Sequence, residues 1–169
     1  MKKIIIILIL LSLISCAKVD AAMSGMKLIS NNFVTYNLYV PDDWIVTSDD
    51  STGYMGAYVS ETDRSNISVT AFEFKEQMTT DEFWEKYKQD FEETFSDMEF
   101  ETISKILLSG YEANCYEYTA ALMGVAYKFM QVVRIHGGTV YIMTYTAIPD
   151  NYEKNLEDVA QIINKFRFK

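Results

Sequence analysis

Histidine and cysteine are scarce in this sequence. Its 169 residues include one histidine, His136, and two cysteines, Cys16 and Cys115. A structural zinc site needs about four Cys or His ligands, which this chain cannot supply without carboxylates. Acyl transfer needs a base held beside its nucleophile, whereas His136 stands beside Gly137-Gly138 at an expected hairpin tip. We therefore expect no catalytic residues, no metal site and no enzymatic activity.

Positive charge and phosphate-binding motifs are also lacking. Lys and Arg number 15 against 24 Asp and Glu, which gives a formal net charge of −9. Such a field repels the phosphates of nucleic acids. Neither G-x-x-x-x-G-K-[ST] nor G-x-G-x-x-G occurs in the sequence. We expect no nucleic-acid partner and no nucleotide or other cofactor.

One acidic loop is a candidate cation site. Asp49-Asp50-Ser51-Thr52-Gly53 offers oxygen ligands of the kind that calcium prefers, but it lacks the EF-hand spacing. Acidic turns are usually just solvated, so the sequence leaves calcium binding at Asp49 to Gly53 open.

Proline and glycine are too few to divide the chain. There are two prolines and seven glycines, with no low-complexity segment and no internal repeat. Hydrophobic residues make up 49% and aromatic residues 14%, which is ample for one core. The length after the N-terminal segment fits a single domain, which we place at residues 33–169.

The first sixteen residues have the layout of a secretory signal peptide. Lys2 and Lys3 precede the apolar run Ile4–Ile14, and the small residue Ser15 follows it. The run is shorter than the roughly 20 apolar residues that span a bilayer. We therefore expect a cleaved signal rather than a permanent transmembrane helix.

Leu13-Ile14-Ser15-Cys16 resembles the bacterial lipobox. The resemblance implies cleavage after residue 15, a lipoprotein with diacylglycerol and palmitate on Cys16, and a flexible tether over residues 16–32. The chain would then sit at the extracytoplasmic face of the cell membrane, or at the outer membrane in a host with two. The alternative is an ordinary signal peptide cleaved near Asp20-Ala21-Ala22.

Alternating residues predict strands in the first half of the domain. Phe33–Val40 and Trp44–Thr47 flank the turn signal Pro41-Asp42-Asp43, which predicts a hairpin. Two more strands are expected at Gly53–Ser60 and Ile67–Phe74. Thr79 and Glu82 have capping-box spacing, and the helix after them carries an aromatic stripe of Trp84, Tyr87, Phe91, Phe95 and Met98.

Four strands with short connections are expected next, at Glu101–Leu108, Tyr111–Leu122, Val125–His136 and Thr139–Ala147. Met123-Gly124 and Gly137-Gly138 fit two-residue turns. Their register makes one sheet face strongly apolar and leaves a mixed second face, which indicates partial cover by a second layer. A second helix capped by Asp150, with Tyr152, Leu156, Val159 and Ile163 along it, and an edge strand at Phe166–Phe168 complete the antiparallel α+β sheet.

Several short stretches occur in a characteristic order: Phe33–Val40 with Pro41-Asp42-Asp43-Trp44, Asn66-Ile67-Ser68-Val69, Leu108–Ala113, Tyr141–Tyr145 and Phe166. In this order the elements resemble the PsbP and DcrB group of bacterial and plastid domains, an α/β/α sandwich shared with the Mog family of Ran-binding proteins. The resemblance spans residues 33–169 and implies an antiparallel sheet flanked by helices. It implies non-enzymatic roles as accessory subunits, assembly factors or cell-envelope lipoproteins, and it supplies no catalytic residues.

Three functions remain open. The first is a membrane-anchored accessory domain that binds a protein partner of unknown identity. The second is a binder of a small apolar or aromatic ligand, with Tyr116, Tyr118, Tyr127 and Phe129 as candidate contacts if a pocket opens between sheet and helix. The third is a hydrolase with an unrecognised site, which would need His136 close to a serine, threonine or carboxylate.

Overall fold

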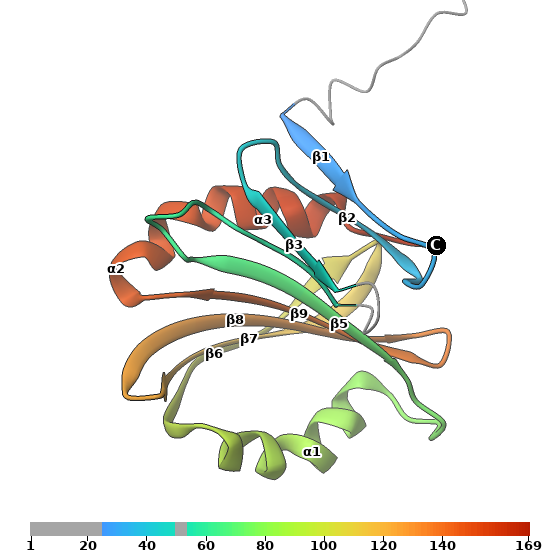
Figure 1. Ribbon diagram of the computed structural model, residues 1–169. Coiled ribbons are helices and arrows are strands. Elements are labelled where there is room, and N and C mark those ends of the chain that lie inside the picture. Colours follow the sequence, from blue (N-terminus) through green and yellow to red (C-terminus); the bar gives the residue numbers. More distant parts are fainter. Residues whose placement is uncertain (1–24, 50–53) are drawn as a thin grey trace, which may run out of the picture.

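A seven-stranded antiparallel sheet forms the middle layer of the domain. The computed structural model describes residues 25–49 and 54–169. Helix α1 (Thr80–Thr94) covers one face of the sheet, and α2 (Pro149–Tyr152) and α3 (Leu156–Lys165) lie on the other (Figure 1). The predicted α+β class and α/β/α layering are confirmed.

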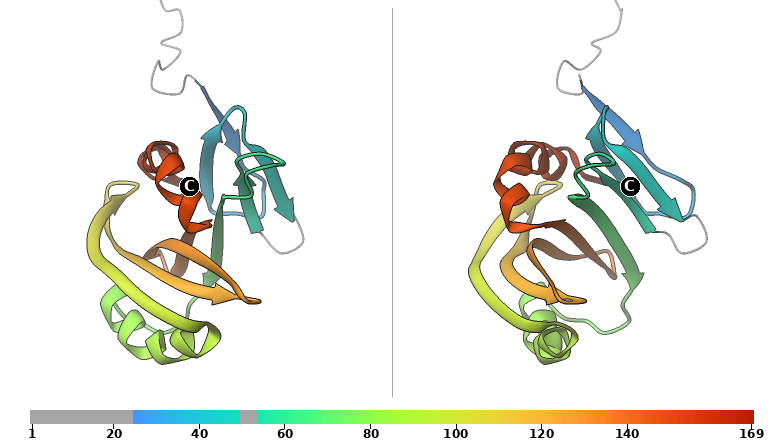
Figure 2. Two further views of the ribbon diagram at one scale, coloured as in Figure 1. Left: turned by 90° about the vertical axis from the view of Figure 1, so that its left-hand side faces the viewer. Right: turned by 60° about the vertical axis from the view of Figure 1, so that its left-hand side comes forward.

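The large sheet has the strand order β3-β4-β5-β9-β8-β7-β6, with every neighbouring pair antiparallel. Its strands are β3 (Ile45–Asp49), β4 (Tyr54–Tyr58), β5 (Asn66–Glu73), β6 (Ser96–Leu108), β7 (Tyr111–Leu122), β8 (Val125–His136) and β9 (Thr139–Ala147). A smaller sheet, in the order β1-β2-β10, lies on the α3 side of the domain (Figure 2). Its strands are β1 (Met26–Ile29), β2 (Tyr36–Pro41) and β10 (Arg167–Phe168).

The two glycine turns set the predicted register. Met123 and Gly124 have φ of 52° and 79°, and Gly137 and Gly138 have φ of 58° and 76°, as turns with two left-handed residues require. The four predicted cross-strand pairs are confirmed: Leu122 with Val125, Tyr118 with Phe129, Val133 with Ile142, and Ile135 with Val140.

Helix α1 begins at the predicted capping box. The Thr79 hydroxyl accepts the Glu82 N–H at 3.2 Å, while the Glu82 carboxylate accepts the Thr79 N–H at 2.7 Å. The helix is shorter than the aromatic stripe predicted, because Phe95 is already extended and Met98 lies in β6. Strand β6 starts five residues earlier than predicted, since two register irregularities against β7 let the pairing continue to Ser96.

The two faces of the large sheet bury separate apolar clusters. Under α1, Phe83 and Trp84 pack on Tyr116, Tyr118 and Phe129. On the opposite face, β2 and α3 cover the side chains of Cys115, Val132, Met143 and Tyr145. The predicted cover of the mixed face by a second layer is therefore confirmed.

The predicted hairpin between Phe33 and Thr47 is wrong. Strand β2 pairs with β1 and β10, whereas β3 pairs with β4 in the other sheet. Trp44 is buried immediately after the turn, and its N–H donates to the Pro41 carbonyl. The turn thus leads the chain from the small sheet into the large one. Strand alternation does not reveal this, because it indicates which face of a strand is buried and not which strand is its pairing partner.

The prediction of a flexible tether over residues 16–32 is wrong at its C-terminal end. Residues 26–29 form β1, which pairs with β2, and Ile29 is buried in the core. The Lys27 ammonium donates to the carbonyls of Asp42 and Trp44, which holds β1 against the following turn. A four-residue strand is too short to show a period. The signal peptide, Cys16 and residues 50–53 of the acidic loop lie outside the described residues.

The C-terminal helical region begins differently from the prediction. Ile148 is the N-cap and Pro149 follows at the first helical position, so Asp150 is not the cap. A short 3-10 turn, η2 (Glu153–Asn155), separates α2 from α3. The predicted edge strand is confirmed as β10, which pairs with Asn37 and Tyr36 of β2.

Candidate functional site

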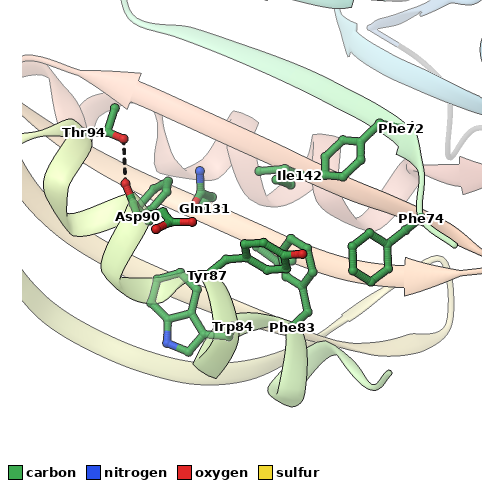
Figure 3. A pocket seen from close by; sticks show the side chains of 11 residues that line it. Phe72, Phe74, Phe83, Trp84, Tyr87, Asp90, Thr94, Gln131 and Ile142 are labelled. Carbon is green, nitrogen blue, oxygen red and sulfur yellow. Dashed lines mark hydrogen bonds between the residues drawn. The ribbon is translucent and has the colours of Figure 1, made fainter. Parts of the chain in front are cut away.

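A cleft opens between α1 and the sheet. It has a volume of about 360 Å³, which lies within the range of small-molecule sites. Most of its lining is aromatic or aliphatic, and one end is polar (Figure 3). The lining residues are Phe72, Phe74, Phe83, Trp84, Tyr87, Asp90, Phe91, Thr94, Gln131, Val133 and Ile142.

Helical and strand periodicities bring these side chains together. On α1, Phe83, Tyr87 and Phe91 are four residues apart and therefore share one face. On β8, Gln131 and Val133 are two residues apart and point to the same face. Strands β5 and β9 pair with each other, and they add Phe72 and Ile142, respectively, to the lining.

Three rings form an aromatic wall at one end of the cleft. The Phe74 and Phe83 centroids are 5.4 Å apart with their planes at 84°, and the Phe83 and Tyr87 centroids are 4.8 Å apart. The Phe74 N–H donates to the Gly138 carbonyl at 2.8 Å, which fixes the chain after β5. Phe72 lies beyond this wall and is 41% exposed, so part of its ring remains open to a ligand.

The other end of the cleft holds three polar residues, Asp90, Thr94 and Gln131 (Figure 3). The Thr94 hydroxyl donates to the Asp90 carbonyl at 2.9 Å. The Gln131 amide nitrogen donates to the Thr144 hydroxyl at 3.4 Å. The Asp90 carboxylate makes no ion pair with any residue in ranges 25–49 and 54–169.

The four aromatic residues predicted as ligand contacts lie beside this cleft but do not line it. Trp84 stacks on Tyr116 at 3.8 Å, and Tyr118 stacks on Phe129 at 4.9 Å. Tyr127 lies 6.2 Å from Phe129 and is half-buried. Burial raises the pKa of Tyr116 to about 12 and raises that of Tyr118 further. Packing between side chains thus fills this part of the interface.

Sequence reasoning missed the residues that do line the cleft. Phe72 and Phe74 alternate at the end of a predicted strand, which the pattern treats as ordinary sheet. Gln131 interrupts an otherwise apolar strand face, and that interruption is the one pattern that could have indicated a polar contact. The pattern could not have shown that α1 stops short of covering these side chains.

Among the described residues, the arrangement that a hydrolase would need is not found around His136. Its ring stacks on Phe168 at 4.3 Å and lies 4.5 Å from Tyr111. Within the part of the chain that the structure describes, no serine, threonine or carboxylate side chain is hydrogen-bonded to it. The geometry gives His136 a packing role at the end of β8.

Neither a metal-binding cluster nor a membrane-spanning helix is found among the described residues. No group of three or more His, Cys, Asp or Glu side chains there is placed to hold a metal ion. None of the helices there combines the length and the apolar composition that crossing a bilayer requires.

Cys115 lies on the α3 face of the sheet and is 4% exposed, as predicted for a buried thiol. Burial and the nearby Glu117 charge raise its pKa to about 11. The thiolate is the reactive form, so at pH 8 only about one molecule in a thousand carries it. We expect iodoacetamide to leave Cys115 unlabelled in the native protein and to label it in guanidinium, as measured by peptide mass spectrometry. Met123→Cys, at a position 98% exposed, is the control and should label at once. Rapid native labelling of Cys115 would contradict its burial.

Comparison with known proteins identifies the fold. No protein-family model matches the sequence, and no curated protein sequence matches it. Among solved structures, cyanobacterial PsbP (CyanoP) from Synechocystis sp. PCC 6803 superposes with a TM-score of 0.61 at 16% identity, over 93% of this chain and 99% of that one. The chain has the PsbP/Mog1-type fold.

Two other proteins of the PsbP/Mog1-type fold superpose over most of their length. LpqN of Mycobacterium tuberculosis, a protein involved in cell envelope biogenesis, matches with a TM-score of 0.58 at 14% identity, over 85% of this chain and 90% of that one. The Saccharomyces cerevisiae Ran-binding protein Mog1p matches with a TM-score of 0.60 at 10% identity, over 85% and 95%. At these identities the likeness concerns the fold alone.

Proposed function

We propose that the chain is a non-enzymatic binding domain of the cell envelope, held at the extracytoplasmic face of a membrane by lipid on Cys16. Its binding site is the cleft under α1, which takes a small apolar or aromatic ligand. The cleft carries this proposal, because it is an open, largely apolar hollow with a few polar groups at one end. The setting of His136 among aromatic rings favours binding over hydrolysis.

A neutral aromatic probe tests the site. The lipidated protein is held in nanodiscs and titrated with 3-ethylindole by calorimetry, with empty nanodiscs as the blank. We expect saturable binding that Phe72→Ala weakens about three- to tenfold, since an aromatic contact contributes about 0.5–1.5 kcal/mol. Val46→Ala removes an apolar side chain of matched exposure, 40% against 41%, outside the cleft and should leave affinity unchanged. Absence of saturable heat would overturn the proposal for this site.

The anchor has its own test. Mass spectrometry of the membrane fraction should find a mature chain that begins at a diacylglycerol-modified Cys16. Cys16→Ser should release the protein from the membrane, while Cys115→Ser should not. A chain that keeps Met1 and stays in the cytosol would contradict the envelope location.

A second candidate function, the binding of a protein partner, is favoured by the edge of the large sheet. Strand β6 is the last strand of the order, so one side of its backbone is unpaired within the described chain. Ile103 and Leu107 lie on one face of it and are 61% and 65% exposed. An extended segment of a partner could add as a further strand here. Photo-cross-linking from position 107 in native membranes should then link peptides of a partner protein to β6. The same label at the exposed position Phe33 should link none.

A further inference from the structure

We infer that the cleft selects ligands in which an aromatic body carries a cationic amine, and that Asp90 and Gln131 hold the amine. This inference rests on the proposed binding function and names the chemical class of its ligand. The polar and aromatic ends of the cleft carry it together (Figure 3).

Gln131 is the least expected residue of the cleft. It is 7% exposed and lies between Phe129 and Val133 on an apolar sheet face. A carboxamide has two N–H donors and an oxygen with two lone pairs, yet that of Gln131 makes one side-chain hydrogen bond, of 3.4 Å, within the described residues. Its polar atoms are not among the buried side-chain atoms that lack a hydrogen-bond partner, so the amide is tolerated without a ligand. Its oxygen can accept a further hydrogen bond, and an amine bound in the cleft would donate to it.

Asp90 gives the polar end its charge. It is the one charged residue of the eleven that line the cleft, and its carboxylate pairs with no described cation. It is exposed and lies just before the last turn of α1, which carries the negative end of the helix dipole and has no basic residue. Both effects favour a cation. Thr94, whose hydroxyl proton is committed to the Asp90 carbonyl, offers its oxygen lone pairs at the same end.

The aromatic wall selects the rest of the ligand. Phe74, Phe83 and Tyr87 present ring faces and edges against which a flat aromatic body packs. The net charge of −9 raises the local concentration of cations and lowers that of anionic amphiphiles. An aromatic carboxylate would satisfy the wall and be repelled by Asp90.

A matched set of indoles tests the inference on the nanodisc-held protein. Tryptamine carries an ammonium group, indole-3-propionate a carboxylate, and 3-ethylindole neither. We expect calorimetry at pH 7 to show that tryptamine binds at least about tenfold more tightly than indole-3-propionate. Asp90→Asn should reduce that ratio to about threefold or less. Glu85→Gln removes the same charge from an exposed site on α1 outside the cleft and should leave the ratio intact.

Gln131→Leu separates ligand contact from folding. It keeps the side-chain size and removes the buried amide, so we expect tryptamine to bind at least about threefold more weakly while the melting temperature stays equal or rises. A lowered melting temperature with unchanged tryptamine affinity would assign Gln131 a structural role and contradict the inference.

The binding site and its selectivity for cations can fail separately, and the results tell the two failures apart. If none of the three indoles binds, both the proposed site and its ligand class are overturned. If all three bind with similar affinity, or if Asp90→Asn keeps the preference for tryptamine, the cleft remains a binding site and the cationic selectivity is overturned.

Discussion

Phe166→Ala is expected to lower the free energy of unfolding by about 3–5 kcal/mol, as deletion of a fully buried ring does. Phe166 is completely buried and stacks on Tyr36 at 5.5 Å, and it meets Phe168 edge-on at 5.2 Å. Its backbone N–H also closes α3 by donating to the Ile162 and Ile163 carbonyls. The Phe166 side chain thus joins the end of α3 to β2 and β10 of the small sheet.

Guanidinium unfolding followed by far-UV circular dichroism measures this loss. Phe33→Ala is the matched control, because Phe33 is 75% exposed and its removal should change stability by about 0.5 kcal/mol or less. Equal effects of the two substitutions would show that Phe166 is not packed as the structure describes.

Trp84→Ala is expected to lower the free energy of unfolding by a similar amount, about 3–5 kcal/mol, because it removes a side chain that packs on the other face of the sheet. The Trp84 ring stacks on Tyr116 at 3.8 Å and contacts Phe91 and Phe100 edge-on, each at 5.7 Å. Without it α1 keeps its capping box but loses the side chain that joins it to the middle of the sheet. Local opening of α1 should then precede global unfolding.

Hydrogen exchange resolves that order. Amides of α1 should exchange faster in Trp84→Ala than those of β8 and β9, which remain paired on both sides. Glu85→Ala, an exposed change at the adjacent helical position, should leave the α1 amides protected. Uniform loss of protection across α1 and the sheet would mean that the helix and the sheet open as one unit.

Local patterns predicted the part of the fold that local interactions determine. The turns at Met123-Gly124 and Gly137-Gly138 place β7, β8 and β9 in register because each joins strands adjacent in sequence. The capping box at Thr79 fixes the start of α1 for the same reason. These features depend on contacts a few residues apart, which the sequence displays directly.

The small sheet could not be predicted in the same way. Strand β2 pairs with β1 on one edge and with β10 on the other, about 130 residues further along the chain. The alternation in Phe33–Val40 is satisfied by any partner that buries the same face. The prediction paired this strand with Trp44–Thr47, the nearest candidate in sequence, whereas β3 pairs with β4 in the other sheet.

The candidate site, like the small sheet, depends on packing between elements far apart in the sequence. The tyrosines of β7 and β8 were predicted to line a pocket, yet the length and position of α1 decide which aromatic residues it covers. Trp84 and Phe91 fill the space above Tyr116 and Tyr118, and the cleft opens toward Phe72 instead. Gln131 and Asp90 come together at one end of it only because α1 packs across β8.

The pairing of β10 with β2 has a consequence for biogenesis. The apolar cluster on the α3 side of the large sheet is incomplete until Phe166 and Phe168 pack against β2, whereas the cluster under α1 includes no residue of β10. The α1 side of the sheet can therefore pack before the C-terminal strand is made, whereas the α3 side cannot.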